Sequence, residues 1–248
     1  MSARRRGVAL LLVLWLMVVL GAIGSSVVMV VRGRLHVATN LRDHAAARAA
    51  AESGVVSLVQ AIEDSLARVG AGSQRDRYLN SLESEGRETA TLGDARFSVT
   101  CEDVNARFDI NMADENALAR FFSGFTSAVR AREIAQAIRQ RTASSVPGAV
   151  SRPLLDVTAL GVVAGLGDTL LDAVATFITV DGDGNVNLQH AAPPVRLVAA
   201  GQIVSAPTRL MLTSRGTRTG STLTHEIQAV YAIQGFQLAI VRWRERDL

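Results

Sequence analysis

The sequence predicts an α+β protein with a long N-terminal transmembrane helix, an antiparallel sheet and an inserted all-helical domain. Three observations lead to this fold class. An uncharged apolar run extends from Val8 to Val31 and has arginines on both sides. Apolar and polar residues alternate over 95–101 and again near the C-terminus, which is typical of strands. Between these stretches, residues 111–178 have helical patterning, which indicates helices inserted into a sheet domain.

The apolar run is long enough to cross a membrane. As a helix it would extend about 36 Å, against a bilayer core of about 30 Å. Arginines 4–6 precede it without a nearby acid, so we expect a cytoplasmic N-terminus and an exported remainder. A cleaved secretory signal peptide and a plain single-span anchor both stay open. The third interpretation is a basic leader, residues 1–7, that resembles a type IV prepilin signal; there a prepilin peptidase cuts between Gly7 and Val8, and the new N-terminus at Val8 is methylated.

The helix is expected to continue beyond the membrane to residue 72. Residues 35–69 contain no proline and are rich in alanine and other helix formers. Apolar residues recur every three or four positions from Val55 to Val69, which predicts one apolar stripe that packs on a soluble domain. Gly70 stands where helices commonly end. We therefore expect a helix over 8–72, with 8–31 in lipid.

The remaining chain divides into a head and an insert. Residues 73–110 form the first part of the head, with a short helix near 75–85 and a strand over 95–101 that buries Phe97, Val99 and Cys101. The helical insert, 111–178, begins with Asn111 or Asp114 as a cap. Residues 179–248 complete the head with C-terminal strands that turn at residues 234–235.

Composition limits the classes of function. The chain has 248 residues, a net charge of +3 and 48% hydrophobic residues, enough for one anchor and one or two modest domains. Its single cysteine, Cys101, excludes an internal disulfide, so an exported fold must depend on its core or on bound ions. The four histidines are scattered, and no serine or cysteine has a nucleophile motif. We expect no enzymatic activity.

One loop has oxygen-bearing side chains at alternate positions. They belong to Asp181, Asp183, Asn185 and Asn187, and oxygen donors in a glycine-containing loop suit calcium. The loop is not an EF-hand, because Val186 replaces the turn glycine and Ala192 stands at the position of the bidentate glutamate. The alternative is an ordinary turn, in which Asp, Asn and Gly are common. Calcium is thus a candidate cofactor.

A second glycine-containing turn, residues 165–167, lies between two predicted helices. Such a hairpin can bind nucleic-acid phosphate through backbone N–H groups. Asp168 and Asp172 would repel phosphate, and no lysine or arginine cluster accompanies the turn. A hairpin that packs within the protein is favoured, and nucleic acid is not an expected partner.

The order and spacing of several segments resemble the minor pseudopilin K of type II secretion systems (the general secretion pathway protein K family). These segments are RRGVALLL at 5–12, AAESG at 50–54, RFDIN at 107–111, LDVTAL at 155–160, GLG at 165–167, FITV at 177–180, NVNL at 185–188 and IVRWRE at 240–245. The resemblance implies a pilin-like fold in the bacterial inner membrane, with a periplasmic head. It also implies a subunit at the tip of the pseudopilus that nucleates or caps its assembly for protein export across the outer membrane.

The resemblance also implies partners: other minor pseudopilins at the tip, the major pseudopilin, the prepilin peptidase and inner-membrane lipid. Major pilins carry a glutamate at the fifth position of the mature helix, where it meets the free amine of a neighbouring subunit. Counted from Val8, this position is Leu12. A subunit without that carboxylate fits best where no neighbour follows, although an ordinary apolar anchor residue is the alternative explanation. A minor pilin or DNA-binding component of a type IV pilus or DNA-uptake machine remains the alternative function.

Overall fold

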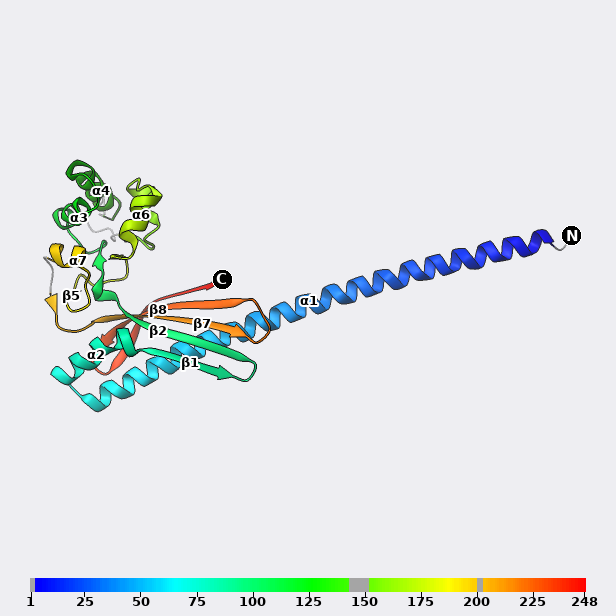
Figure 1. Cartoon of the computed structure of the whole chain (residues 1–248), viewed down its shortest axis with the longest axis horizontal. Coiled ribbons are helices and arrows are strands. Elements are labelled where there is room, and N and C mark those ends of the chain that lie inside the picture. The colour runs from blue at the N-terminus through cyan, green and yellow to red at the C-terminus, as the bar shows by residue number, and fades with distance from the viewer. Residues whose placement is uncertain (1–2, 143–151, 200–202) are drawn as a thin grey trace.

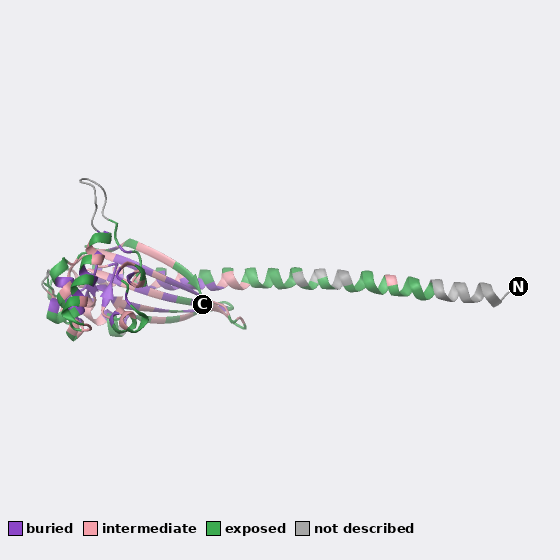
Figure 2. Ribbon diagram, turned by 90° about the horizontal axis from the view of Figure 1, so that it is seen from above, coloured by how far each residue is buried: buried purple, intermediate pink, exposed green. Residues whose placement is uncertain are grey.

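The computed structural model describes residues 3–142, 152–199 and 203–248. One long helix, α1 (Ala3–Val69), projects from a head that packs against its C-terminal part (Figure 1). Where described, side chains of α1 outside the head are mostly exposed, and the buried residues are concentrated in the head (Figure 2). The structure thus consists of a rod and a head, as the sequence predicts.

The head is built on a five-stranded antiparallel sheet in the order β1-β2-β7-β8-β9. Its strands are β1 (Arg87–Leu92), β2 (Ala95–Asp103), β7 (Arg209–Arg218), β8 (Thr224–Gln234) and β9 (Gln237–Asp247). The predicted strand with buried Phe97, Val99 and Cys101 is confirmed as part of β2. The predicted C-terminal hairpin is confirmed as β8 and β9. The sequence analysis missed the central strand β7 and the edge strand β1.

The C-terminal half of α1 packs on one face of this sheet. Its apolar stripe, with Val55, Ile62 and Leu66 fully buried, meets inward-facing residues of β2, β7 and β8. Helix α2 (Ser73–Glu85) closes the end of this core with Leu79 and Leu82. Burial of apolar surface between helix and sheet supplies the main stabilisation, at about 25 cal/mol per Å².

Small residues let α1 approach the central strand closely. A Cβ on Gly216 of β7 would overlap the carbonyl oxygen of Ala47 and the amide nitrogen of Ala51. A Cβ on Gly54 would likewise meet the ring of Phe97, with its Cδ2 atom at 2.6 Å. The alanine- and glycine-rich segment of α1 therefore packs closely on the sheet.

The helical insert has a second apolar core. Its residues extend from Phe108 to Val198, and Phe121, Phe122, Ile134 and Ile138 are at its centre. The elements in and around it are η1 (Val104–Ala106), β3 (Phe108–Asp109), α3 (Glu115–Ser123), α4 (Ala128–Thr142), α5 (Ala159–Val163), α6 (Asp168–Ala175), β4 (Ile178–Thr179), β5 (Val186–Asn187), α7 (Pro193–Val198) and β6 (Ile203–Val204). Short parallel pairs join β3 to β4 and β5 to β6. The insert lies at the end of the head away from the N-terminus (Figure 1).

The two candidate caps of the first insert helix have different roles. Asp114 is the N-cap of α3, and its carboxylate accepts a hydrogen bond from the amide of Ala117 at 2.7 Å. The Asn111 side chain instead bonds the backbone of Leu154 and the carbonyl of Val180. Asn111 therefore joins segments that are far apart in the chain.

The membrane-spanning segment expected at 8–31 lies within α1. The side chains of 8–12, 26–28 and 30–31 lie outside the described part of the structure. Among the residues that are described, no helix has the length and apolar character that crossing a membrane requires. The spanning segment stays a prediction.

Candidate functional site

The junction between the sheet and the helical insert is organised by Asn105, a residue that is 1% exposed. Its Oδ1 atom accepts hydrogen bonds from the amides of Thr208 at 2.8 Å and Arg209 at 3.0 Å. Its Nδ2 atom donates to Asp183 Oδ1 at 2.9 Å and to the carbonyl of Asn185 at 3.2 Å. Asn105 follows β2, the loop 181–187 follows β4, and Thr208 precedes β7. One buried amide thus fixes the segments by which the chain passes between sheet and insert.

Asp183 is the second centre of the junction. Besides Asn105, its carboxylate accepts hydrogen bonds from the Thr208 hydroxyl at 2.6 Å and from the amide of Asn185 at 3.1 Å. Burial raises the pKa of Asp183, but these bonds and the nearby Arg209 more than offset that effect and lower it overall. The carboxylate is therefore ionised in the folded protein at neutral pH.

Asp181, the first of the predicted calcium ligands, pairs with arginines of β9. Its carboxylate lies 2.6 Å from Arg242 Nη1 and 3.5 Å from Arg244 Nη2. Arg209 Nη1 donates to the carbonyls of Asp181 and Gly182, each at 2.6 Å. Guanidinium groups therefore provide the positive charge at this part of the loop.

Asp109 lies against the same loop from the insert side. Its Oδ1 atom accepts from the amides of Asn111 at 2.9 Å and Met112 at 3.2 Å, whereas Oδ2 is buried without a hydrogen-bond partner. Burial raises the pKa of Asp109 in spite of the amide hydrogen bonds. Gly182 is required here, because a Cβ would lie 2.7 Å from Asp109 Oδ2.

Asn187, the last of the predicted calcium ligands, belongs to a separate cluster of hydrogen-bonded polar side chains. Its Nδ2 atom donates to Asp103 Oδ2 at 2.7 Å and to Asn80 Oδ1 at 2.9 Å. Burial raises the pKa of Asp103, although Asn187 and the nearby His190 act in the opposite direction. His190 Nδ1 lies 3.3 Å from Asp103 Oδ2 and 2.8 Å from Glu83 Oε2.

The predicted calcium ligands therefore do not converge on one point. Asp181 is directed to β9, Asp183 accepts hydrogen bonds from Asn185 and Thr208, and Asn187 bonds Asp103. As a set they do not fit a single calcium ion in this arrangement, since calcium needs six to eight oxygens around one centre. Calcium binding stays a prediction, and in the structure these residues join the insert to the sheet.

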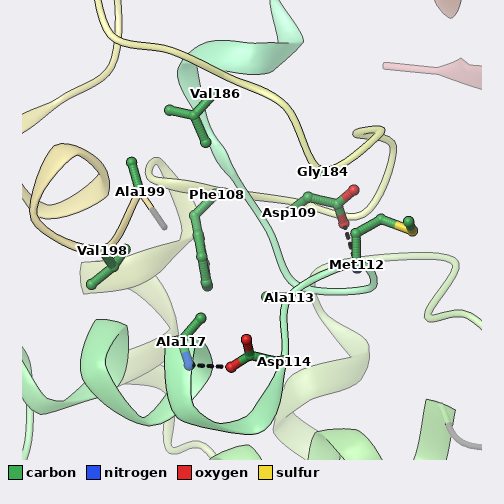
Figure 3. Close-up of a pocket in the computed structure, with 10 residues that line it drawn as sticks. All are labelled: Phe108, Asp109, Met112, Ala113, Asp114, Ala117, Gly184, Val186, Val198 and Ala199. Carbon is green, nitrogen blue, oxygen red and sulfur yellow. Dashed lines mark hydrogen bonds between the residues drawn. The ribbon is translucent and has the colours of Figure 1, made fainter. Parts of the chain in front are cut away.

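A small cavity lies beside this junction, between β3, the start of α3, and α7 (Figure 3). Phe108, Val186 and Val198 line it with apolar surface, and its volume is about 130 Å³. Ligand pockets are commonly about 300–1,000 Å³. We therefore interpret it as a packing gap in the insert and assign it no ligand.

The hairpin at residues 165–167 is confirmed as the turn between α5 and α6. Arg130 of α4 donates to the carbonyls of Ala164 at 3.0 Å and Gly165 at 2.9 Å. Leu160, before the turn, and Leu166, within it, belong to the insert core. The hairpin thus packs within the insert, as the sequence predicts.

The remaining predicted positions lie in the first turns of α1. Gly7, Val8 and Leu12 are in its helical backbone, but their side chains are outside the described part of the structure. Cleavage and methylation at Gly7–Val8 and a tip-specific role for Leu12 therefore stay predictions.

Comparison with known proteins supports the architecture. No protein-family model and no curated protein sequence matches the chain. A solved structure does match: a chain of the GspK–GspI–GspJ complex from the type 2 secretion system of enterotoxigenic Escherichia coli. The similarity covers 79% of this chain and 96% of that chain, with a TM-score of 0.50 and 16% sequence identity. At this identity the similarity shows the fold, so the chain has a type II secretion pseudopilin-like α+β fold.

Proposed function

We propose that this protein is a minor pseudopilin at the tip of a type II secretion pseudopilus. There it would nucleate or cap assembly together with other minor pseudopilins and the major pseudopilin, for protein export across the outer membrane. The observation that carries the proposal is the position of the helical insert at the end of the head away from the N-terminus (Figure 1). The similarity to a chain of the GspK–GspI–GspJ complex supports other minor pseudopilins as partners.

The junction makes the insert an effective obstacle to stacking. Subunits of a filament built from parallel α1 helices are offset along the filament axis, so the next subunit would approach the distal end of this head. The insert has its own core and is fastened to the sheet through Asn105, Asp183 and Arg209. A fixed insert at the distal end leaves this chain best suited to a terminal position.

The last part of the proposal concerns the N-terminal part of α1 as a membrane anchor. Where the structure describes them, residues of α1 outside the head are mostly exposed, including Trp15 at 70% and Met29 at 76%. With the uncharged run 8–31 and the preceding arginines, they support a single-pass location in the bacterial inner membrane, with the head in the periplasm. Prepilin peptidase would cut between Gly7 and Val8. Mass spectrometry of the mature protein should find an N-terminus that begins at methylated Val8, and an intact Met1 or a cut near residue 25 would contradict this step.

We propose that Leu12 restricts this chain to the terminal position of the filament, because its side chain cannot neutralise the amine of a following subunit. The variant L12E restores a carboxylate and should allow incorporation within the filament. L11E, one residue earlier on another face of the helix, is the matched control. Equal effects of the two variants on incorporation would remove this role for Leu12.

Labelling of cysteine variants tests the outward position of the insert. Val162 on α5 is 91% exposed, and Val37 on α1 is 60% exposed. The native Cys101 is buried, and burial raises the pKa of its thiol, so it contributes little background. We expect V162C to react equally fast with a maleimide before and after pseudopilus assembly, and V37C to become protected. Equal protection of both variants would show that subunits stack on the insert and would overturn the proposal.

Calcium remains a proposed ligand of the loop 181–187. Its binding would require Asp183 to exchange the hydrogen bonds from Thr208 and Asn185 for the ion. Melting of the full chain in detergent, with and without millimolar calcium, tests this. A higher melting temperature that D183N abolishes supports binding, and an unchanged temperature in the wild type removes calcium from the proposal.

A further inference from the structure

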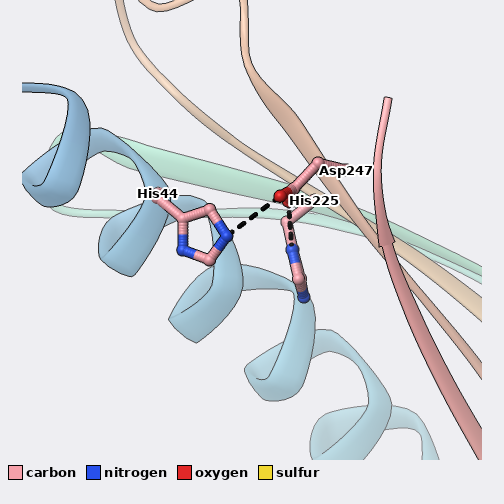
Figure 4. Close-up of side chains that lie close together, drawn as sticks. All are labelled: His44, His225 and Asp247. Carbon is pink, nitrogen blue, oxygen red and sulfur yellow. Dashed lines mark hydrogen bonds and ion pairs between the residues drawn. The ribbon is translucent and has the colours of Figure 1, made fainter.

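We infer that His44, His225 and Asp247 form a binding site for a divalent transition-metal ion of the zinc type, which fastens the last strand of the sheet to α1. The His44 Nε2 atom lies 3.0 Å from Asp247 Oδ2, and His225 Nδ1 lies 2.7 Å from Asp247 Oδ1 (Figure 4). One ligand atom from each residue can be chosen so that all lie within 4.8 Å of one another. The site is independent of the proposed role in secretion.

The backbone brings these residues together. His225 and Asp247 are directly paired across β8 and β9. Because side chains alternate along a strand, His225 shares the helix-facing side with Ile227, which is fully buried in the core under α1. His44 reaches the pair from α1, and the two imidazole rings meet edge to face with centroids 5.4 Å apart. Helix and strands therefore provide ligands whose positions are fixed by the main packing of the head.

The donor set suits zinc. Imidazole nitrogen and carboxylate oxygen are common zinc ligands, and sites with three protein ligands leave a further position for water or another group. Calcium and magnesium prefer sites composed of oxygen, so two imidazoles argue against them. Among divalent ions, the chemistry favours zinc and its neighbours cobalt, nickel and copper.

The hydrogen bonding of His225 supplies a second argument. The residue is 4% exposed, and its Nε2 atom is buried without a hydrogen bond of good geometry. Asp247 Oδ1 faces Nδ1, and Glu245 Oε2 lies 3.3 Å from Nε2. In a neutral imidazole one nitrogen carries the N–H and the other has a lone pair that can bind a metal ion. With a cation bound at Nδ1, the Nε2–H group can donate to Glu245.

Glu245 is well placed for that role. Its Oε1 atom accepts a hydrogen bond from Trp243 Nε1 at 2.7 Å and pairs with Arg48 Nη2 at 3.2 Å. Its other oxygen therefore stays directed at His225. A carboxylate that accepts the second N–H of a metal-bound histidine is a recurrent feature of zinc sites, and it fixes the tautomer and the orientation of the ring.

Metal titration of the full chain in detergent, carrying an affinity tag without histidine, tests the inference. After treatment with a chelator, the protein should bind one Zn²⁺ per chain by calorimetry. Co²⁺ should give the visible absorption of a four-coordinate site. Zinc should also raise the melting temperature, because an ion that binds only the folded state stabilises it. Absence of zinc binding and of the cobalt spectrum in the wild type overturns the site.

Variants separate this site from adventitious binding. H44Q, H225Q and D247N should each abolish the cobalt spectrum, and E245Q should weaken affinity about 10–100-fold. H36Q is the matched control, because His36 is an exposed histidine on the same helix. Since H225Q changes a buried residue, circular dichroism must show a folded protein; H44Q, at a half-exposed position, gives the same test without this risk. Equal loss of metal binding in H36Q and H44Q, or metal binding retained in H44Q, contradicts the assignment of this site.

Discussion

Gly216 of β7 lies against the backbone of Ala47 in α1 so closely that even a methyl group on Gly216 would overlap the Ala47 carbonyl oxygen. Both sides of this contact are backbone, so neither can move aside as a flexible side chain could. The contact lies where α1 enters the head. It therefore determines how closely the long helix can pack on the central strand.

The variant G216A should lower the free energy of unfolding by about 1–3 kcal/mol, the usual range for a group forced into a filled site. Denaturant unfolding of the full chain in detergent measures this change. G161A is the matched control: Gly161 lies in α5, and its added Cβ would meet only the Leu166 carbonyl oxygen at an ordinary 3.7 Å. Equal stability of G216A and wild type would contradict the close contact.

Because Asn105 joins the sheet to the insert, its replacement should destabilise this junction locally. The variant N105A leaves the amides of Thr208 and Arg209 and one oxygen of Asp183 without their partner, so we expect a loss of about 1–3 kcal/mol. Hydrogen exchange should become faster in 181–187 and 203–209 and stay slow in β8. N116A, at an exposed position of α3, should change stability by less than about 0.5 kcal/mol. Unaltered exchange at the junction in N105A would argue against this role.

From the surroundings of Glu226 we expect the stability of the fold to depend on pH. Its side chain is fully buried between Arg215 and Arg246, with contacts of 2.6 and 2.5 Å. Burial raises the pKa of Glu226, but the hydrogen bonds of the two arginines outweigh burial and lower it from the ordinary 4.5. A lowered folded-state pKa means that the ionised glutamate stabilises the fold above pH 4.5 and loses this effect as the pH falls through the folded value.

The variant E226Q should therefore be less stable than wild type at neutral pH, by about 1.5–3 kcal/mol, and the difference should shrink in acid. Denaturant unfolding at neutral and acidic pH measures both values. E133Q is the control, because Glu133 pairs with Arg130 at the surface, where ion pairs contribute about 0–1 kcal/mol. A difference that stays constant across this pH range would refute the assignment to Glu226.

The elements that the sequence predicts well have a clear local pattern. The strand β2 alternates apolar and polar residues, and so does β8. The strand β7 was missed because its inward-facing positions change from Leu210 and Leu212 to Ser214 and Gly216, where α1 comes close. Only the tertiary contact explains those small residues. The edge strand β1 was missed because it is mostly exposed and has little apolar signal.

The candidate sites were less predictable for a related reason. The alternating acids and amides of the loop 181–187 are visible in the sequence, but their partners Asn105 and Thr208 are far from them along the chain. Local spacing predicts an ion at this loop, but it does not indicate the hydrogen bonds and guanidinium contacts that the same side chains make in the structure. His44, His225 and Asp247 likewise have no shared spacing, since they come from α1, β8 and β9.

The position of this chain in isolated pseudopili is the most direct test of its proposed role. Antibodies against the helical insert, detected by gold particles in electron micrographs, locate each copy on the filament. A terminal subunit predicts label at one end only, independent of filament length. Label distributed along the filament, or filaments without label at either end, would contradict the proposed position of this chain at the tip.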